Sequence, residues 1–294
     1  MKENNRYIYT DLACEDYERT DTVNASGVSY NEYDADGMKI ADLRVTSRDG
    51  EKALGKPIGS YITIDTGRLW EQEYDASLQA IKLISANLND LMHSACKKIE
   101  SVLVCGLGNR SITPDAIGPL TIDGVTVTRH IKEEDPTLYS QMSAYDISAV
   151  NAGVVGQTGV ETAEIISGVV KTVKPSVIIA VDALAARSAT RLATTVQMTD
   201  TGVRPGSGIG QKRRELSRQT MGVPVIAIGV PTVASSATLV YDALEEAGAK
   251  ANQKLTEILE NGRNFFVSLN ESDIVVNKMA HVISEAINRT LLGA

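Results

Sequence analysis

Cysteine, histidine and aromatic residues are all scarce in this sequence. Its 294 residues include three cysteines and three histidines, and neither a CxxC pair nor an HExxH segment occurs. An odd number of widely spaced cysteines does not make a disulfide framework, and the histidines lack the spacing of a zinc site. We therefore expect reduced thiols in a cytosol-like compartment, and we expect neither a bound metal nor a cofactor.

Long apolar runs and an excess of basic charge are also missing. No segment approaches the ~18 consecutive apolar residues of a membrane span, and the polar N-terminus lacks the apolar centre of a secretory signal. The formal net charge is −8, and the longest basic cluster, Lys212–Arg214, is too short to form a general nucleic-acid surface. These absences predict a soluble, cytoplasmic protein that contacts neither a membrane nor nucleic acid directly.

An aliphatic core is what the composition does provide. Hydrophobic residues make up 43% of the chain and aromatic residues 4%, a balance that suits helices packed on parallel strands. From residue 76 onward, short apolar runs alternate with segments of helical periodicity, which predicts a three-layer α/β/α fold with a mostly parallel sheet. A small β-rich flank precedes it, and the polar residues 1–35 predict a loosely held arm. The predicted strands are 38–45, 58–64, 102–105, 125–128, 177–181, 194–199 and 223–230, and the predicted helices are 76–99, 162–173, 212–220, 236–261 and 271–292.

The segment 101–120 combines a strand, a glycine turn and a helix start. Its apolar run at 102–105 reads as a buried strand, and the glycines that follow tolerate positive φ. Thr113, Pro114 and Asp115 have the order of an N-cap, an N1 proline and a first-turn carboxylate. This sequence of elements places the loop at the carboxyl edge of a sheet, where sites gather in open α/β folds.

Asp182 follows a second buried strand, 177–181, and would share that edge with Asp115 if the two strands are parallel. Two carboxylates that converge on one water can divide the work of acid and base, because repulsion and unequal burial separate their pKa values. Structural roles are equally available: Asp115 can stabilise a helix N-terminus, and Asp182 can cap the segment 183–191. Spacing alone favours the structural roles, since aspartates at strand ends are common in α/β proteins.

Two further groups carry weaker signals. The glycine-rich loop 206–210 could cradle a phosphate, but it matches neither the P-loop nor the dinucleotide motif, which favours a structural turn. Cys105 would need a base such as His130 to act as a nucleophile. Because Cys105 lies inside an apolar run, a small buried hydrophobic residue is the better interpretation.

The order of these motifs resembles the spore germination protease family of endospore-forming bacteria. The resemblance is continuous over about residues 101–233 and weak after 235. The matching segments are GLGNRSITPDAIGPL (106–120), VTRH (127–130), NAGVVGQTGVETAEII (151–166), VDALAARS (181–188), TDTGVRPGSGIGQKRREL (199–216) and GVPVIAIGVPTV (222–233), with YTDLACE (9–15) and GKPIGSYITI (55–64) nearer the N-terminus.

The resemblance implies an activity and a site. Members of that family are homotetrameric endopeptidases that are made as zymogens and degrade the small acid-soluble proteins coating spore DNA during germination, and their fold resembles that of hydrogenase-maturation proteases. Their two proposed catalytic aspartates lie in motifs that correspond here to Asp115 and Asp182. The resemblance therefore reverses the preference for structural roles. Of the two, Asp115 is expected to be the base because a helix N-terminus favours its anion, and Asp182, at the end of a buried strand, is expected to have a raised pKa and to be the acid. It also implies that the protein works in the forespore or spore core.

A processing site is implied as well, because members cleave themselves between an acidic and an apolar residue followed by alanine. Thr10 to Ala13 fits that pattern, so we expect cleavage between Asp11 and Leu12. The chain would then comprise a propeptide (1–11), the β-rich flank (12–75) and the protease core (76–294). The residues expected to support the substrate are Asn109, Arg187, Arg204 and Lys212.

Two other functions remain open at this point. The hydrogenase-maturation relatives bind nickel through carboxylates, so a metal-dependent peptidase of the same fold is one alternative. The other is a non-enzymatic α/β protein that binds a phosphate or nucleotide at 206–210.

Overall fold

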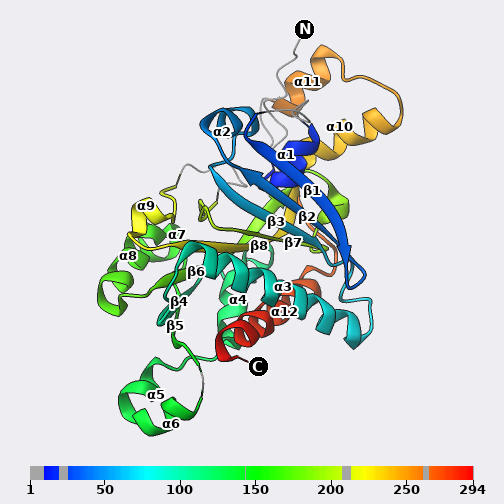
Figure 1. Ribbon diagram of the computed structural model, residues 1–294. Coiled ribbons are helices and arrows are strands. Elements are labelled where there is room, and N and C mark those ends of the chain that lie inside the picture. Colours follow the sequence, from blue (N-terminus) through cyan, green and yellow to red (C-terminus); the bar gives the residue numbers. More distant parts are fainter. Residues whose placement is uncertain (1–9, 20–25, 143, 207–212, 261–264, 294) are drawn as a thin grey trace.

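One mixed β-sheet runs through the protein (Figure 1). The computed structural model describes residues 10–19, 26–142, 144–206, 213–260 and 265–293. Within these ranges the strand order is β1-β2-β3-β7-β8-β6-β4-β5, and β9 pairs with β8. The strands are β1 (Val28–Ala35), β2 (Met38–Val45), β3 (Gly59–Asp65), β4 (Ser101–Gly106), β5 (Asp146–Asn151), β6 (Val177–Ala186), β7 (Thr195–Thr199), β8 (Val225–Ser235) and β9 (Phe266–Val267).

Helices cover both faces of this sheet and connect its strands. None of the helices in the described ranges is both long and apolar enough to cross a membrane. The α-helices are α1 (Ala13–Arg19), α2 (Arg48–Leu54), α3 (Tyr74–Ala95), α4 (Ile117–Gly124), α5 (Arg129–Glu134), α6 (Pro136–Gln141), α7 (Val155–Thr158), α8 (Thr162–Val173), α9 (Arg218–Met221), α10 (Ser236–Glu246), α11 (Gln253–Glu260) and α12 (Ser272–Leu292), and the 3-10 helices are η1 (Thr113–Asp115) and η2 (Ala189–Arg191).

The predicted α/β/α class is confirmed. Strands β5, β4, β6 and β8 are parallel, whereas β8, β7, β3, β2 and β1 pair antiparallel. The parallel strands form the half of the sheet that carries the candidate site. The β-rich flank extends the same sheet, because β3 pairs with β7.

Both faces of the central strands are buried, as their unbroken apolar runs predict. In β6, Ile179 and Val181 belong to the larger apolar cluster, which α3, α4 and α12 cover. Ile178 and Ala180 belong to a second cluster on the opposite face, where α8 and α9 contribute Ile166 and other apolar residues. The amphipathic periodicity that predicted α3, α8 and α12 therefore corresponds to real packing.

The prediction of a loosely held N-terminal arm is wrong for the described part of residues 1–35. Helix α1 and strand β1 form there, and Leu12 and Cys14 are buried in a third apolar cluster together with Ala41 and Leu184. A short apolar segment in polar surroundings gives little signal in the sequence. Packing against residues distant in the chain decides its conformation.

Several boundaries also differ from the expected ones. The expected strand 125–128 is absent, because β5 occupies the position beside β4. The expected helix 236–261 is divided into α10 and α11, with Gly248 in a left-handed conformation between them. The expected helix 212–220 is wrong over residues 213–217, which are not helical; a helix, α9, forms only from Arg218, and Lys212 lies outside the described residues.

Gly118 allows α4 to lie directly against the strands that carry the candidate site. A Cβ atom there would come within 2.3 Å of the Leu107 carbonyl oxygen and 2.5 Å of the Val181 carbonyl oxygen. Leu107 directly follows β4, and Val181 lies in β6. These backbone atoms therefore cannot move aside without shifting the strands.

We expect Gly118→Ala to lower the free energy of unfolding by about 1–3 kcal/mol through overpacking. Gly168 in α8 provides the matched control, since a Cβ there would meet nothing within 4 Å. Gly168→Ala should be stabilising by about 0.5–1 kcal/mol, because alanine favours a helix interior. Urea unfolding of both variants measures the difference. A Gly118→Ala protein as stable as the unmodified chain would contradict this account of the packing.

Candidate active site

The loop after β4 positions Asp115. It is the last residue of η1, and its Oδ2 accepts a hydrogen bond of 2.7 Å from the Asn109 N–H. Gly108 is essential to this turn: its φ is +106°, and a Cβ would lie 2.1 Å from the Asp115 carbonyl oxygen. Thr232 on β8 donates to the Pro114 carbonyl at 2.6 Å, which fixes η1 to the sheet.

This arrangement differs from the expected helix start. Thr113 begins a 3-10 helix rather than capping an α-helix, and α4 starts at Ile117, after Asp115. The backbone hydrogen bond to the Asp115 carboxylate comes from Asn109 in the same loop. Burial raises the pKa of Asp115, while the Asn109 N–H and the positive charge of Arg213 act to lower it.

Asp182 lies inside β6 rather than at its end. The strand continues to Ala186, because β8 pairs with it from Asp182–Gly229 to Ala186–Ala234, with a shift of register between Leu184 and Ala185. Asp182 is only 5% exposed, and its Oδ1 accepts the Ala183 N–H at 2.9 Å. Burial raises the pKa of Asp182 well above its usual range, and the negative charges of Asp115 and Asp11 raise it further.

The structure thus brings together the two aspartates that the sequence paired. The charge of Asp115 acts on Asp182, and of the two carboxyl groups Asp182 has the pKa raised well above the usual range. Their unequal environments separate the two pKa values in the direction expected from the sequence, although burial and not a helix N-terminus is the main cause.

A cavity of about 510 Å³ opens beside Asp182. Its floor is a cross-strand row in which Gly229 on β8 lies between Asp182 on β6 and Gln197 on β7. Residues in register across a sheet point to the same face, and neighbouring strands are about 4.8 Å apart. Asp182 and Gln197 therefore point to the same face of the sheet, and the Leu184 side chain packs over Gly229. Leu184 and Lys56 also line the cavity.

Asp11 in the chain's own N-terminal segment forms part of the wall of this cavity. The Asp11 N–H donates to the Ala185 carbonyl at 2.9 Å, and the Ala185 N–H donates to Asp11 Oδ2 at 2.8 Å. Leu12 is fully buried. The peptide bond expected to be processed therefore lies alongside β6, three residues from Asp182.

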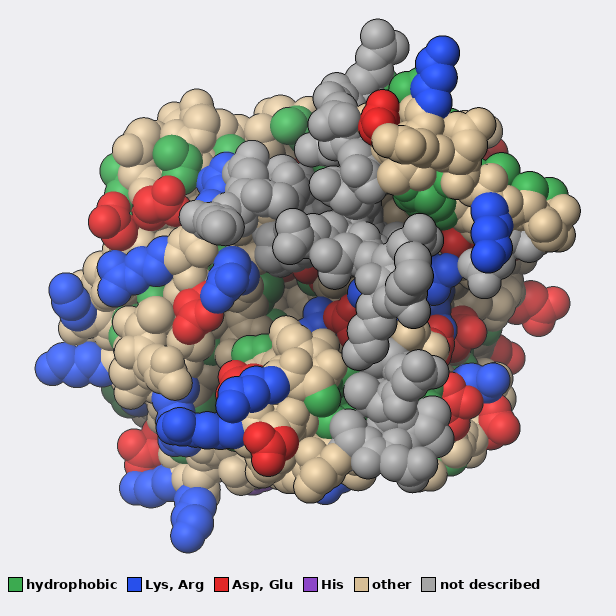
Figure 2. All heavy atoms as spheres, turned by 90° about the horizontal axis from the view of Figure 1, so that it is seen from above, with side chains coloured by type: hydrophobic (Ala, Val, Ile, Leu, Met, Phe, Trp, Pro, Cys, Tyr) green, Lys and Arg blue, Asp and Glu red, His purple; other side chains and the backbone are tan. Residues whose placement is uncertain are grey.

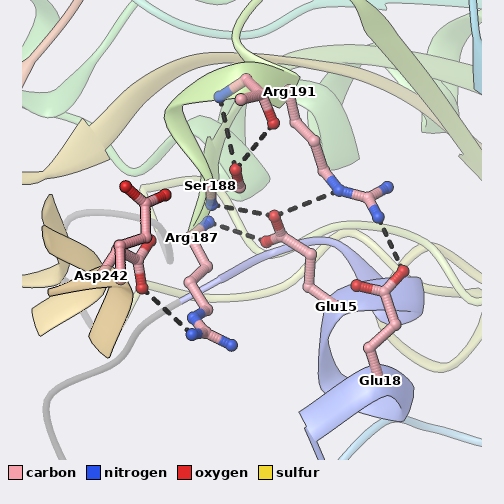
Figure 3. Close-up of a pocket in the computed structure, with 8 residues that line it drawn as sticks. Glu15, Glu18, Arg187, Ser188, Arg191 and Asp242 are labelled. Carbon is pink, nitrogen blue, oxygen red and sulfur yellow. Dashed lines mark hydrogen bonds and ion pairs between the residues drawn. The ribbon is translucent and has the colours of Figure 1, made fainter. Parts of the chain in front are cut away.

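Glu15 attaches this N-terminal segment to the residues that follow β6 (Figure 3). Its carboxylate is 3% exposed and accepts the backbone N–H groups of Arg187 at 2.7 Å and Ser188 at 3.0 Å. Arg191 Nε lies 3.4 Å from it, and the Thr10 hydroxyl donates to the same carboxylate. A buried carboxylate with this many donors fixes the start of α1 against the loop that follows β6.

The residues expected to support the substrate lie in different places. Asn109 contacts Asp115, and Arg204 lines the cavity, where it pairs with Glu215 at 3.1 Å. Arg187 lines a separate pocket and pairs with Asp242 at 3.1 Å, as Figure 3 shows. Lys212 lies outside the described residues.

The sequence did not single out Lys56, Gln197 or Glu15. A polar Gln197 inside a predicted strand and a Lys56 inside the family-like segment 55–64 were the available signals. Neither signal shows which cavity the side chain enters.

The sequence also raised three other candidates: a cysteine nucleophile, a glycine-rich phosphate loop and a metal site. Cys105 is fully buried in β4, and burial raises the pKa of its thiol, as expected of a small core residue. His130 lies in α5, on an element apart from β4. The loop 206–210 lies outside the described residues apart from Gly206. Within the described ranges, no three His, Cys, Asp or Glu side chains are grouped so that they could hold a metal ion.

Comparison with known proteins gives consistent matches. The model of the family described as germination protease matches residues 9–247. A germination protease from Caldanaerobacter subterraneus subsp. tengcongensis is 39% identical, covering 97% of this chain and 94% of the relative. One from Clostridium tetani is 36% identical over 96% of this chain and 85% of the relative, and one from Oceanobacillus iheyensis is 43% identical over 78% and 62%.

Among solved structures, a [NiFe] hydrogenase maturation protease HycI from Thermococcus kodakarensis KOD1 aligns with 70% of this chain and 98% of its own. Its TM-score is 0.37 and its sequence identity is 17%. The family match, by contrast, spans both aspartates, the N-terminal segment and most of the sheet. The resemblance noted in the sequence is thereby confirmed: the chain belongs to the germination protease family, and it is a protease.

Proposed function

We propose that this protein is an endopeptidase that cleaves after acidic residues and uses Asp115 and Asp182 to activate water. One observation carries the proposal: Asp11, whose carbonyl belongs to the bond expected to be cleaved, lines the same cavity as Asp182. A segment of acidic, apolar and small residues is therefore already bound where a buried acid is available. General acid–base catalysis by a positioned pair contributes typically 10²–10⁴-fold to a rate.

The division of roles follows from the two pKa values. Asp182, with its pKa raised well above the usual range, is the protonated partner at neutral pH and serves as the acid. Asp115, whose carboxylate is supported by the Asn109 N–H and by Arg213, is the ionised partner and serves as the base.

The physiological substrates that we propose are the small acid-soluble spore proteins, degraded during germination in the spore core. The names of the relatives support a role in germination. On the face seen in Figure 2, Lys and Arg side chains are interspersed with Asp and Glu around a hollow near its middle. That distribution suits a polypeptide substrate better than direct contact with DNA.

We further propose that the protein is made as a zymogen and assembles as a homotetramer. The docked segment supports the first part, since an uncleaved chain keeps Asp11 at the wall of the cavity that Asp182 also lines. Self-cleavage after Asp11 would leave residues 12–294 as the processed form.

We expect Asp115→Asn and Asp182→Asn each to lower cleavage of a peptide containing Thr-Asp-Leu-Ala by at least about 10²-fold. Neither variant should form a chain that begins at Leu12. Asp90→Asn is the matched control, because Asp90 is exposed on α3. Peptide turnover and N-terminal mass analysis measure both effects. Normal cleavage by folded Asp115→Asn and Asp182→Asn proteins would refute the aspartate mechanism.

The pH dependence of kcat/KM should be bell-shaped. The rate rises with pH as Asp115 ionises and falls at higher pH as Asp182 loses its proton. Because the pKa of each group is raised, both limbs of the profile should lie at a higher pH than the ordinary carboxyl range. The two apparent pKa values then belong to the coupled pair and not to either residue alone. Peptide assays at constant ionic strength test this expectation. A rate that only rises from acid to alkaline pH would be inconsistent with an acidic Asp182.

Asp182→Asn should stabilise the fold at neutral pH. Because the pKa of Asp182 is higher in the folded than in the unfolded state, stability falls as pH rises from about 4 toward the folded value. Asparagine avoids this loss and keeps an oxygen for the Ala183 N–H. We expect a Tm gain of a few degrees near pH 7 that vanishes below about pH 4. An unchanged or lower Tm at pH 7 would mean that the burial of Asp182 costs no stability.

A further inference from the structure

Two hydrogen-bond donors converge on one carbonyl oxygen beside Asp182. The Asp11 carbonyl accepts from Lys56 Nζ at 3.0 Å and from Gln197 Nε2 at 3.1 Å. This is the carbonyl of the peptide bond at which we propose that the chain is processed. An ammonium group and an amide group are the donor types that stabilise a developing oxyanion.

Gln197 is held rigidly in its position. It lies in β7 in register with Gly229, is 6% exposed, and uses its Oε1 to accept the Ala13 N–H at 2.7 Å. That second bond fixes the orientation of the side-chain amide, so that its N–H₂ group points to the Asp11 carbonyl. One side chain thus contacts the backbone on both sides of the bond between Asp11 and Leu12.

Lys56 reaches the same oxygen from the segment between α2 and β3. Its side chain is 16% exposed and also lies 3.1 Å from Asp16 Oδ2, so it is held at two points. Gly55, at φ +74°, ends α2 and turns the chain so that Lys56 faces the cavity. The two donors come from β7 and from the α2–β3 connection, which are separated in the chain by about 140 residues.

We propose that Lys56 and Gln197 are catalytic residues that bind the oxyanion formed when the carbonyl of the acidic residue is attacked. The inference rests on the proposed function. A water oxygen bonds to the Asp11 carbonyl carbon as the base removes its proton, and the carbonyl oxygen becomes the anion that the two donors hold. The bond from carbon to the Leu12 nitrogen then breaks, and the acid protonates that nitrogen. The products are a carboxylate at Asp11 and a free amine at Leu12.

The same donors would serve a substrate bound in trans. A peptide that follows the path of Thr10 to Ala13 would place the carbonyl of its acidic residue at Lys56 and Gln197. Its acidic side chain would take the position of the Asp11 carboxylate at the Ala185 N–H. The backbone of β6 and these two side chains would then set the register of cleavage.

The experiment compares single-residue variants of the full chain. Lys56→Met and Gln197→Met remove one donor each with little change in volume, and each should slow formation of the Leu12 terminus by about 10²–10³-fold. Lys56→Arg keeps a cationic donor and should recover part of the rate. The same variants are assayed on the Thr-Asp-Leu-Ala peptide, where kcat should fall more than KM rises.

Two controls separate catalysis from simple anchoring. Lys171→Met removes an exposed cation from α8 and should form the Leu12 terminus within about twofold of the unmodified rate. The second control is the Thr-Asp-Leu-Ala peptide. If Lys56→Met and Gln197→Met slowed formation of the Leu12 terminus but cleaved the peptide at the unmodified rate, the two side chains would only anchor the N-terminal segment, and the inference would be wrong.

The remaining outcomes distinguish this inference from the proposed function. Normal rates in folded Lys56→Met and Gln197→Met proteins, with Asp182→Asn inactive, would overturn the oxyanion assignment and leave the aspartate mechanism standing. No cleavage of chain or peptide by the unmodified protein under any condition would overturn the proposed function and the inference together. Circular dichroism and Tm establish that each variant is folded.

Discussion

The burial of the Asp182 carboxyl group in the middle of a sheet is the constraint on which the candidate site depends. A carboxylate removed from water is costly unless it is paired, so the group favours its protonated form. Asp115 and Asp11 add negative charge nearby, and both act in the same direction. Burial in the sheet therefore shifts this carboxyl group toward its protonated form relative to an exposed aspartate.

The sheet arranges the rest of the site around that acid. Gly229 lies on the strand between Asp182 and Gln197, and the Leu184 side chain packs over the glycine, in the space that a Cβ atom would need. The extension of β6 beyond Asp182 offers Ala185 as a backbone partner for the docked segment. Two long strands, β6 and β8, therefore supply the acid, the floor of the cavity and one wall of the peptide path.

A second buried carboxylate explains why the N-terminal segment stays in this position. Glu15 receives two backbone N–H groups and an arginine, in contrast to Asp182, whose Oδ1 accepts one backbone N–H. The first arrangement satisfies a charge and fixes structure, whereas the second leaves a carboxyl group available for chemistry. The two residues show how burial of the same functional group serves two purposes in one protein.

The sequence by itself determined much of the local structure and the family to which the chain belongs. Apolar periodicity placed α3, α8, α12 and the central strands, and the family-like motifs selected Asp115 and Asp182. Only the tertiary structure decided what faces these aspartates. The row of Asp182, Gly229 and Gln197, and the packing of Leu12 in one apolar cluster with Leu184, join segments up to about 200 residues apart. Local propensity carries no information about such pairings, because strand register and side-chain burial are fixed only when the whole sheet has formed.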